Sequence, residues 1–116
     1  MAGSNDNIFM QIINREIPAE IVYENDTVLA FKDIEPKAPI HILIVPKRCI
    51  QDVSSCQDDD GHVLGQLILA ARDLAKKFEI KEGLRLVINE GKDGGQTVAH
   101  LHVHLLAGRS FDWPPG

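Results

Sequence analysis

Three histidines, His100, His102 and His104, alternate with aliphatic residues near the C-terminal end of this chain, in the sequence HLHVHLL over residues 100–106. Side chains of a β-strand alternate between its two faces, so a strand here would place the three imidazoles on one face. The aliphatic face can pack into a core. The imidazole face needs a polar partner, a metal ion or a ligand, because burial of three unpaired histidines is costly.

Three interpretations of this segment are open from the residues alone. The histidines could be structural residues whose nitrogens are satisfied by hydrogen bonds. Two histidines at i and i+2 could share a zinc ion with bonds near ~2.1 Å. However, the first and third histidines would lie about 13 Å apart along a strand that rises ~3.3 Å per residue, so one ion would not reach all three without strain. The third interpretation is a phosphate site in which a histidine is the nucleophile.

A glycine-rich segment just before the histidines favours the phosphate site. Residues 91–97, with the sequence GKDGGQT, can turn successive backbone N–H groups toward an anion. Asn89 ends the preceding predicted strand and His41 lies in another, so both could line the same pocket. A histidine that attacks through one ring nitrogen must carry its proton on the other, and a nearby backbone carbonyl could hold that proton.

The rest of the chain predicts the elements that position these residues. Apolar spacing predicts a helix over residues 7–15, limited by Pro18. Strands are predicted over residues 21–24 and 27–33, joined by a tight turn, and over residues 40–45, before Pro46. Two more strands are predicted over residues 84–90 and 99–107, with residues 91–97 as the loop between them.

The clearest predicted helix begins at Ser54. Ser54 as N-cap and Gln57 at the third helical position fit a capping box. Acidic residues 58–60 near its start and Lys76 and Lys77 near its end suit the helix dipole. The broad apolar stripe between them consists of Val63, Leu64, Leu67, Ile68, Ala71, Leu74, Ala75 and Phe78. Five strands and two helices without βαβ alternation predict an α+β fold with an antiparallel sheet.

Length and composition limit the class of protein. The chain has 116 residues, enough for one domain, and its 44% hydrophobic and 25% charged residues are typical of a soluble globular protein. We expect residues 1–6 to be a flexible N-terminus, residues 7–109 the domain and residues 110–116 a C-terminal tail. A net charge of −5, with no run of Lys or Arg longer than two, argues against nucleic acid as a partner.

Cysteine count and hydropathy indicate the compartment. Cys49 and Cys56 are too few for a disulfide framework. The first residues lack the pattern of a signal peptide, and the longest apolar runs fall far short of the ~20 residues needed to cross a bilayer. We therefore expect a cytoplasmic protein, or also a nuclear one in a eukaryote, with no membrane partner.

The histidine motif resembles the His-φ-His-φ-His-φ-φ signature of the histidine triad (HIT) family, where φ is hydrophobic. The similarity extends from Asn7-Ile8-Phe9 to the final Trp113-Pro114-Pro115-Gly116. It includes FKDI at 31–34, PKAPIH at 36–41, VINEG at 87–91 and DGGQT at 93–97. These segments are similar to the branch of histidine triad nucleotide-binding proteins, which are purine nucleoside phosphoramidases.

This resemblance implies an activity and roles for the histidines. The reaction would be hydrolysis of the P–N bond of purine nucleoside 5′-phosphoramidates, of the AMP-amine or GMP-amine type and including aminoacyl-adenylates, through a covalent nucleotidyl-histidine. His102 would be the nucleophile. His104 and Thr97 would bind phosphate oxygens and assist the leaving amine, and His41 and His100 would orient the nucleophile. No cofactor and no metal are implied.

The resemblance also implies a homodimer with one continuous sheet and a purine nucleotide as the small-molecule substrate. Asp33 would bind the ribose hydroxyls, Asn89 would bind near the ribose or phosphate, and backbone amides of Gly95 and Thr97 would face the phosphate. Many relatives have serine where this chain has Thr97. The tail would bring Trp113 to the partner's site. The remaining expected substrate-binding residues are Gln96 of the phosphate loop and Phe9, Ile12, Ile17, Phe31 and Ile34 of an apolar purine slot.

A second class of function stays open. The chain could be a nucleotide-binding interaction or regulatory module whose catalysis is incidental. Turnover of a phosphoramidate, as opposed to binding of AMP alone, distinguishes the two.

Overall fold

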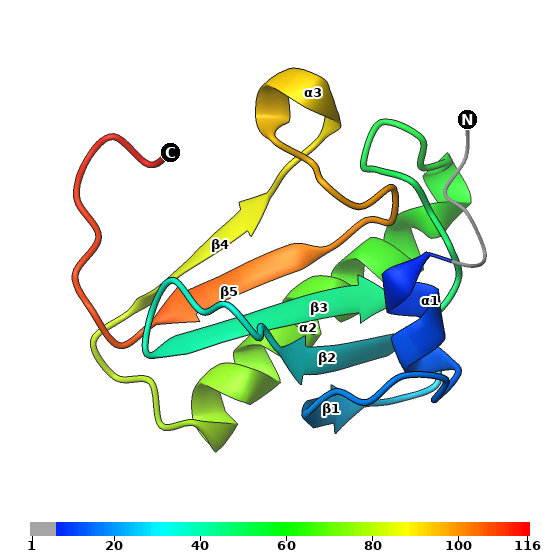
Figure 1. The fold of residues 1–116 in the computed structure, drawn as a ribbon. Coiled ribbons are helices and arrows are strands. Elements are labelled where there is room, and N and C mark those ends of the chain that lie inside the picture. Colours follow the sequence, from blue (N-terminus) through cyan, green and yellow to red (C-terminus); the bar gives the residue numbers. More distant parts are fainter. Residues whose placement is uncertain (1–6) are drawn as a thin grey trace.

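Five antiparallel strands form the centre of the computed structural model, which describes residues 7–116 (Figure 1). The expected flexible N-terminus, residues 1–6, lies outside the described residues. The elements are α1 (Ile8–Ile13), β1 (Ile21–Glu24), β2 (Val28–Lys32), β3 (Ile40–Pro46), α2 (Gly61–Lys77), β4 (Leu84–Ile88), α3 (Gly91–Gly94) and β5 (Val103–Ala107). The strand order β1-β2-β3-β5-β4, antiparallel throughout, confirms the predicted α+β class.

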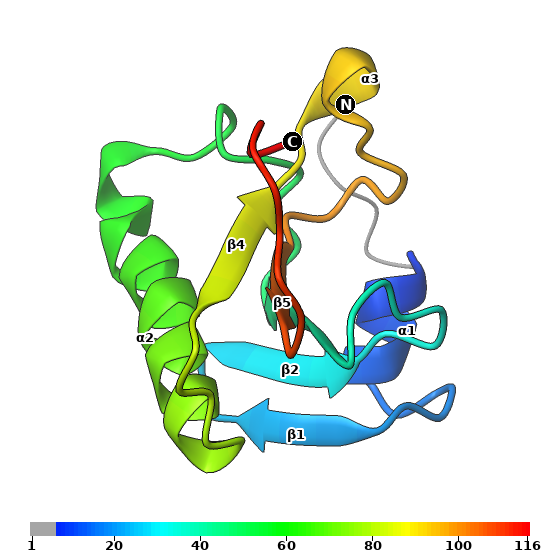
Figure 2. The ribbon, with the colours of Figure 1, turned by 90° about the vertical axis from the view of Figure 1, so that its left-hand side faces the viewer.

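The two longer helices lie on opposite faces of the sheet (Figure 2). α2 covers one face, and the buried core beneath it is formed mainly by Val28, Ala30, Ile42, Ile44, Leu67, Ala70, Ala71, Leu74, Val103 and Leu105. α1 covers part of the other face, where a smaller core consists of Phe9, Ile12, Leu29, Phe31, Leu43 and Val45. The pleat therefore sends alternate residues of β2 and β3 into two different cores.

Helix α1 is shorter than the predicted helix over residues 7–15. Asn7 caps it, since its Oδ1 accepts a hydrogen bond from the Met10 N–H at 2.9 Å. The helix ends at Ile13 because the next residues leave helical backbone geometry, and Arg15 has a positive φ of 62°. In this conformation the Arg15 N–H bonds the Ile12 carbonyl at 3.1 Å and closes the helix end.

The predicted capping box at Ser54 is wrong. A 3₁₀ turn over Asp58–Asp60 precedes α2, and the reciprocal cap joins Gln57 to Asp60. The Gln57 N–H donates to Asp60 Oδ2 at 2.8 Å, and Arg48 forms an ion pair with the same carboxylate. Ser54 lies outside the helix, with its N–H donating to Glu90 Oε1 at 2.9 Å. The cap is therefore formed by Asp60 and not by Ser54, and the Asp60 carboxylate both accepts the cap hydrogen bond and pairs with Arg48.

The predicted strand over residues 99–107 is half correct. β5 begins only at Val103, so His104 is the one triad histidine inside a regular strand. The backbone before it bonds elsewhere: the His100 N–H donates to the Val98 carbonyl at 2.8 Å and the Leu101 N–H to the Ile50 carbonyl at 2.6 Å. β4 likewise ends at Ile88, two residues early.

The loop predicted over residues 91–97 contains a third helix, which the sequence reasoning missed. α3 is a single turn, and Gly95 ends it with a φ of 79°. Such left-handed geometry favours glycine, so the glycines that predicted a loop are also what closes this turn. No helix within residues 7–116 is long and apolar enough to span a membrane.

Candidate active site

A cavity of about 320 Å³ lies beside α1, on the sheet face opposite α2. Aliphatic and aromatic side chains from α1, β2 and the segments that follow them form most of its wall, and histidines line it as well. Its lining residues are Ile8, Phe9, Ile12, Ile17, Pro18, Ala19, Phe31, Lys32, Asp33, Ile34, Leu43, Thr97, Val98, His102 and His104. The cavity thus combines an apolar slot with imidazoles.

The structure brings together many of the predicted site residues, from both ends of the chain. Those that line this cavity are Phe9, Ile12, Ile17, Phe31, Asp33, Ile34, Thr97, His102 and His104. His41 and His100 do not line the cavity, but each is hydrogen-bonded to a histidine that does: His41 to His104, and the His100 carbonyl to His102. Asn89, Gly95, Gln96 and Trp113 lie outside its lining.

His102 is held so that one particular ring nitrogen carries a lone pair. Its Nδ1 lies 2.7 Å from the His100 carbonyl oxygen. A carbonyl only accepts, so Nδ1 carries the proton and Nε2 of the neutral ring is unprotonated. Burial lowers the pKa of His102, and this favours the neutral form. The expectation that a nearby backbone carbonyl could fix the tautomer of a histidine in this segment is confirmed for His102.

His100 is completely buried, and its ring nitrogens hold neighbouring segments by hydrogen bonds. Its Nε2 donates to the Pro46 carbonyl oxygen at 2.9 Å, and its Nδ1 accepts from Asn7 Nδ2 at 3.1 Å. The Phe9 ring packs edge-on against both His100 and His102, with centroid distances of 5.8 and 5.0 Å. His100 therefore fixes the segment whose carbonyl holds His102.

His41 and His104 form a chain of hydrogen bonds that starts from the backbone. The Lys37 N–H donates to His41 Nδ1 at 3.1 Å, so neutral His41 carries its proton on Nε2. That Nε2 lies 3.0 Å from His104 Nδ1, which must accept. His104 consequently carries its own proton on Nε2. Burial, with smaller effects from His102 and His41, lowers the pKa of His104 to about 4.

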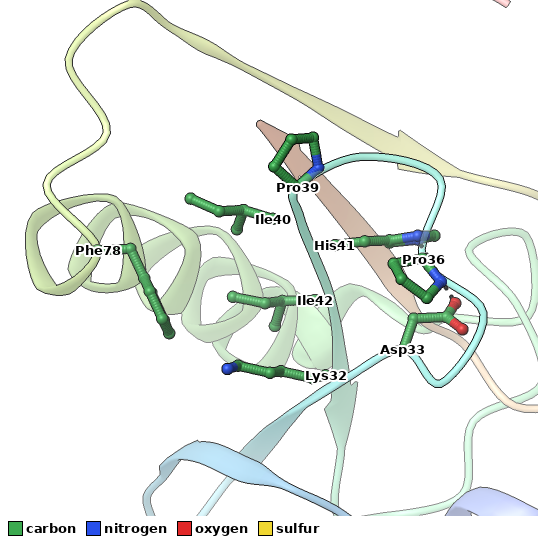
Figure 3. Close-up of a pocket in the computed structure, with 8 residues that line it drawn as sticks. All are labelled: Lys32, Asp33, Pro36, Pro39, Ile40, His41, Ile42 and Phe78. Atoms are coloured by element: carbon green, nitrogen blue, oxygen red, sulfur yellow. Dashed lines mark ion pairs between the residues drawn. The ribbon is translucent and has the colours of Figure 1, made fainter. Parts of the chain in front are cut away.

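Asp33 lies at the end of β2, beside this chain. Its Oδ1 accepts from the Glu35 N–H at 2.8 Å, and its Oδ2 lies 3.5 Å from His41 Nε2. Figure 3 shows Asp33 and His41 on one side of β3 and Phe78, from the end of α2, on the other. Because the Asp33 side chain is partly exposed and lines the cavity, it can accept hydrogen bonds from hydroxyl groups there.

Asp33, His41 and His104 also form the group among residues 7–116 whose spacing could suit a metal, with ligand atoms within 4.8 Å of one another. A metal on His41 Nε2 would require the ring proton on Nδ1. Nδ1 already faces the Lys37 N–H, which can only donate. The donor set as arranged therefore fits a hydrogen-bonded chain and does not fit a metal.

The glycine segment forms a second, more open cavity of about 580 Å³, lined by Gln51, Gly91, Lys92, Gly95, Gln96, Thr97 and Ala99. Thr97 lines both cavities. The Gln96 side chain is a brace of this segment: it accepts from the Gly91 N–H at 3.0 Å and donates to the Gln51 and Val98 carbonyls at 2.7 and 3.0 Å. The backbone of Asn89 lies close to Gly94, since a Cβ at Gly94 would be 3.8 Å from the Asn89 carbonyl carbon.

Trp113 is 86% exposed and does not reach the cavity of its own chain. The tail before it is held by Phe111, whose ring is flanked by the guanidinium groups of Arg85 and Arg109 at 5.0 and 4.2 Å. Arg85 also donates to the Asp112 carbonyl at 2.9 Å.

Sequence reasoning missed three residues that set the state of the histidines: Asn7, Lys37 and Pro46. Lys37 and Pro46 act through a backbone N–H and a backbone carbonyl, which every lysine and every proline carries, so no side-chain pattern could have found them. Asn7 had a usable signal, since an asparagine whose side-chain oxygen caps a helix still has its NH₂ group with which to donate to a second residue.

The chain is similar to known proteins in both sequence and fold. A family model described as HIT domain matches residues 14–111. An uncharacterized HIT-like protein of Synechocystis is 51% identical over 113 residues, which cover 97% of this chain and 99% of the relative. The crystal structure of a HIT family hydrolase from Legionella pneumophila has a TM-score of 0.90 at 45% identity, covering 94% and 98%. A histidine triad nucleotide-binding protein from Candida albicans has a TM-score of 0.78 at 30% identity, covering 94% and 83%.

Proposed function

The chain belongs to the HIT domain family, and from this premise we propose that it is a purine nucleoside phosphoramidase. It would hydrolyse the P–N bond of AMP-amine or GMP-amine compounds to the nucleoside monophosphate and the amine. The observation that carries the proposal is the His102 ring, whose Nδ1 proton is held by the His100 carbonyl, which leaves Nε2 with its lone pair. Relatives named as hydrolases and as a nucleotide-binding protein support it.

The cavity suggests how a nucleotide would lie. The purine would occupy the apolar slot formed by residues such as Phe9, Ile12 and Phe31. Asp33 would accept hydrogen bonds from the ribose hydroxyls. The phosphate would then meet Thr97 and the Nε2–H of His104, because both line the same cavity as His102.

The reaction would proceed in two displacements at phosphorus. His102 Nε2 attacks, a P–Nε2 bond forms, and the P–N bond to the amine breaks as the amine takes up one proton. Water then attacks the nucleotidyl-histidine, the P–Nε2 bond breaks, and water releases one proton, which balances the first step. During the intermediate the His102 ring is cationic, and the His100 carbonyl at Nδ1 stabilises that charge. His104 would stabilise the phosphoryl oxygens through its Nε2–H and hold the water that gives the amine its proton, because a neutral His104 has no second proton to give.

Rapid-quench measurement of the covalent intermediate tests this function. An AMP-amine substrate should give an acid-labile mass increase of one nucleotidyl group, mapped to the peptide that contains His102. Turnover should persist after exhaustive chelator treatment. Tight AMP binding without turnover of any phosphoramidate in a panel of bases and amines would contradict the proposal and favour a binding module.

We also propose that the protein is a homodimer whose sheet continues through β4. Among the described residues β4 pairs only with β5, and Leu84 and Ile88 on this edge strand are exposed. Ile68 and Leu69 on α2 are exposed as well. An unpaired edge with apolar side chains is a template for a second strand. Sedimentation equilibrium at micromolar concentration should give twice 12.8 kDa, and a monomer mass would contradict the dimer.

A further inference from the structure

The segment that follows β5 is in tight contact with residues 33–39, which join β2 to β3 and are called the proline loop below. Arg109 Nε donates to the Lys37 carbonyl oxygen at 3.0 Å. Next to it, Gly108 has a φ of 93°, and a Cβ there would lie 2.8 Å from Pro39 Cβ. Only glycine fits this approach without moving the loop. The end of β5 therefore fixes where Lys37 lies.

Lys37 is also the residue whose N–H begins the hydrogen-bond chain of the site. The N–H reaches His41 Nδ1 at 3.1 Å, and His41 Nε2 reaches His104 Nδ1 at 3.0 Å. Figure 3 shows His41 extending from β3 toward the proline loop at Pro36. Arg109, Lys37, His41 and His104 thus form a continuous series of contacts from the surface to the cavity.

We propose that Arg109 is a positioning residue that holds Lys37 and so, together with the Asp33 carboxylate 3.5 Å from His41 Nε2, keeps the proton of His41, and through it that of His104, on Nε2. The tautomers belong to the free protein, and only their effect on catalysis rests on the proposed function. If the Lys37 N–H moves away, His41 can place its proton on Nδ1 and accept at Nε2. His104 would then donate from Nδ1 and present a lone pair at Nε2, which would repel a phosphate oxygen.

The other two histidines of the site, His100 and His102, provide an internal control. His100 is fixed by the Pro46 carbonyl and His102 by the His100 carbonyl, neither of which involves the proline loop. A disturbance transmitted through Lys37 should therefore change His41 and His104 and leave His100 and His102 unchanged. General loosening of the fold would change all four.

Nuclear magnetic resonance of ¹⁵N-histidine-labelled protein tests the proposal directly, since long-range ¹H–¹⁵N correlations identify the protonated nitrogen of each ring. In the unmodified protein we expect protonation at Nε2 for His41, His100 and His104 and at Nδ1 for His102. Arg109→Ala should give mixed tautomers at His41 and His104 only. Gly108→Ala should do the same, because it displaces Pro39.

Arg85→Ala is the matched control. Arg85 also stacks on Phe111 and donates to the Asp112 carbonyl, whereas Arg109 donates to the Lys37 carbonyl. It should leave all four tautomers unchanged. Arg109→Lys should restore part of the original pattern, because its ammonium can donate to the Lys37 carbonyl. Unchanged tautomers in Arg109→Ala, or the same change in Arg85→Ala, would overturn the proposal.

A kinetic measurement separates this inference from the proposed function. With an AMP-amine substrate, Arg109→Ala should lower kcat roughly tenfold, with little change in KM. This is less than the loss expected for His104→Ala, because part of the His104 population would keep its original tautomer. If the tautomers shift as expected while the unmodified protein turns over no phosphoramidate, the proposed function fails and the positioning role stands. If the protein is active and kcat is unaffected by a confirmed tautomer shift, the catalytic consequence is wrong.

Discussion

The face of the sheet under α2 and the face under α1 differ in how completely a helix covers them. α2 has 17 residues and buries a fully apolar core. α1 has six residues and packs on part of its face, beside the cavity that His102 and His104 line. The polar side chains of the site lie on the α1 face, and the buried histidines there have hydrogen-bond partners within the protein.

The same strands supply side chains to the apolar core on one face and to the polar site on the other. Residues of one strand serve both faces in alternation: Val103 and Leu105 enter the α2 core, whereas His104 between them faces the other side. In the same way, Ile42 belongs to the core and His41 to the hydrogen-bond chain. Substitutions on the two faces should therefore have separable effects, on stability under α2 and on chemistry under α1.

His102→Ala should give the largest effect on the α1 face. With His102 as the proposed nucleophile, its loss is expected to lower kcat by about 10⁴–10⁶-fold and to abolish the nucleotidyl adduct. Val103→Ala is the control from the opposite face, since it removes buried methyl groups next to the same backbone. It should reduce stability and keep the adduct. Near-normal turnover in His102→Ala would mean that water attacks phosphorus directly.

His104→Ala should have a smaller effect on the same face. In the proposed mechanism it removes the hydrogen bond to the phosphoryl oxygens and the path of the proton to the amine but keeps the nucleophile, so we expect kcat to fall by about 10²–10⁴-fold. The adduct should still form, more slowly, in rapid-quench experiments. If His104→Ala is as severe as His102→Ala and forms no adduct, the two histidines act as one unit and their separate roles are wrong.

Leu74→Ala tests the α2 face. Leu74 is fully buried, and its truncation should lower the free energy of unfolding by about 2–5 kcal/mol. Urea denaturation at fixed protein concentration measures this, and kcat of the folded protein should change little. Lys76→Ala, at an exposed position of the same helix, should change stability by less than about 0.5 kcal/mol. A large loss of kcat in folded Leu74→Ala would remove the distinction between the faces.

The pH dependence of stability should also arise mainly from the α1 face. The pKa values of His41, His100, His102 and His104 are lowered, chiefly by burial. The unfolded chain therefore binds more protons below pH ~6.5, so the stability gained from neutral histidines is present above that pH and is lost as pH falls toward the folded-state pKa, about 4 for His104. The urea midpoint should fall between pH 7 and 5.5, and fall less in His104→Ala. If the urea midpoint fell equally with pH in the unmodified protein and in His104→Ala, the lowered pKa of His104 would not be a source of the pH dependence.

Trp113→Ala should produce the smallest effect. If the tail reaches the cavity of a partner in the proposed dimer, the indole contacts the leaving group and not the nucleotide. The value of kcat/KM should then change by different factors, on the order of a few-fold, for bulky and small amines. Equal factors for all amines would indicate that Trp113 only packs on the surface.

Alternation and hydrophobic spacing predicted the sheet and the shared face of the histidines, whereas the apolar cavity residues, among them Phe9, Ile12 and Phe31, were predicted from the resemblance to the HIT family. The structure places them with His102 and His104 around one cavity. The start of β5 could not be predicted, because the backbone before it bonds to Ile50 and not to a neighbouring strand.

The tautomers of His41 and His104 and the role of Gly108 escaped sequence reasoning for a related reason. They depend on a backbone N–H at Lys37 and on the approach of Pro39, which are contacts between segments far apart in the chain. Patterns of residue type report faces and spacing, but they do not report which backbone groups meet.

The amide of Asn7 has a consequence for local unfolding. Its oxygen caps α1 at Met10, and its nitrogen donates to Nδ1 of His100, whose own backbone carbonyl accepts from Nδ1 of His102. A helix of six residues is not stable in isolation, so α1 persists through such contacts. If α1 frays, the anchor of His100 is lost at the same moment. We therefore expect α1 and the histidine segment to exchange their amide hydrogens as one cooperative unit, separate from the slowly exchanging amides of α2.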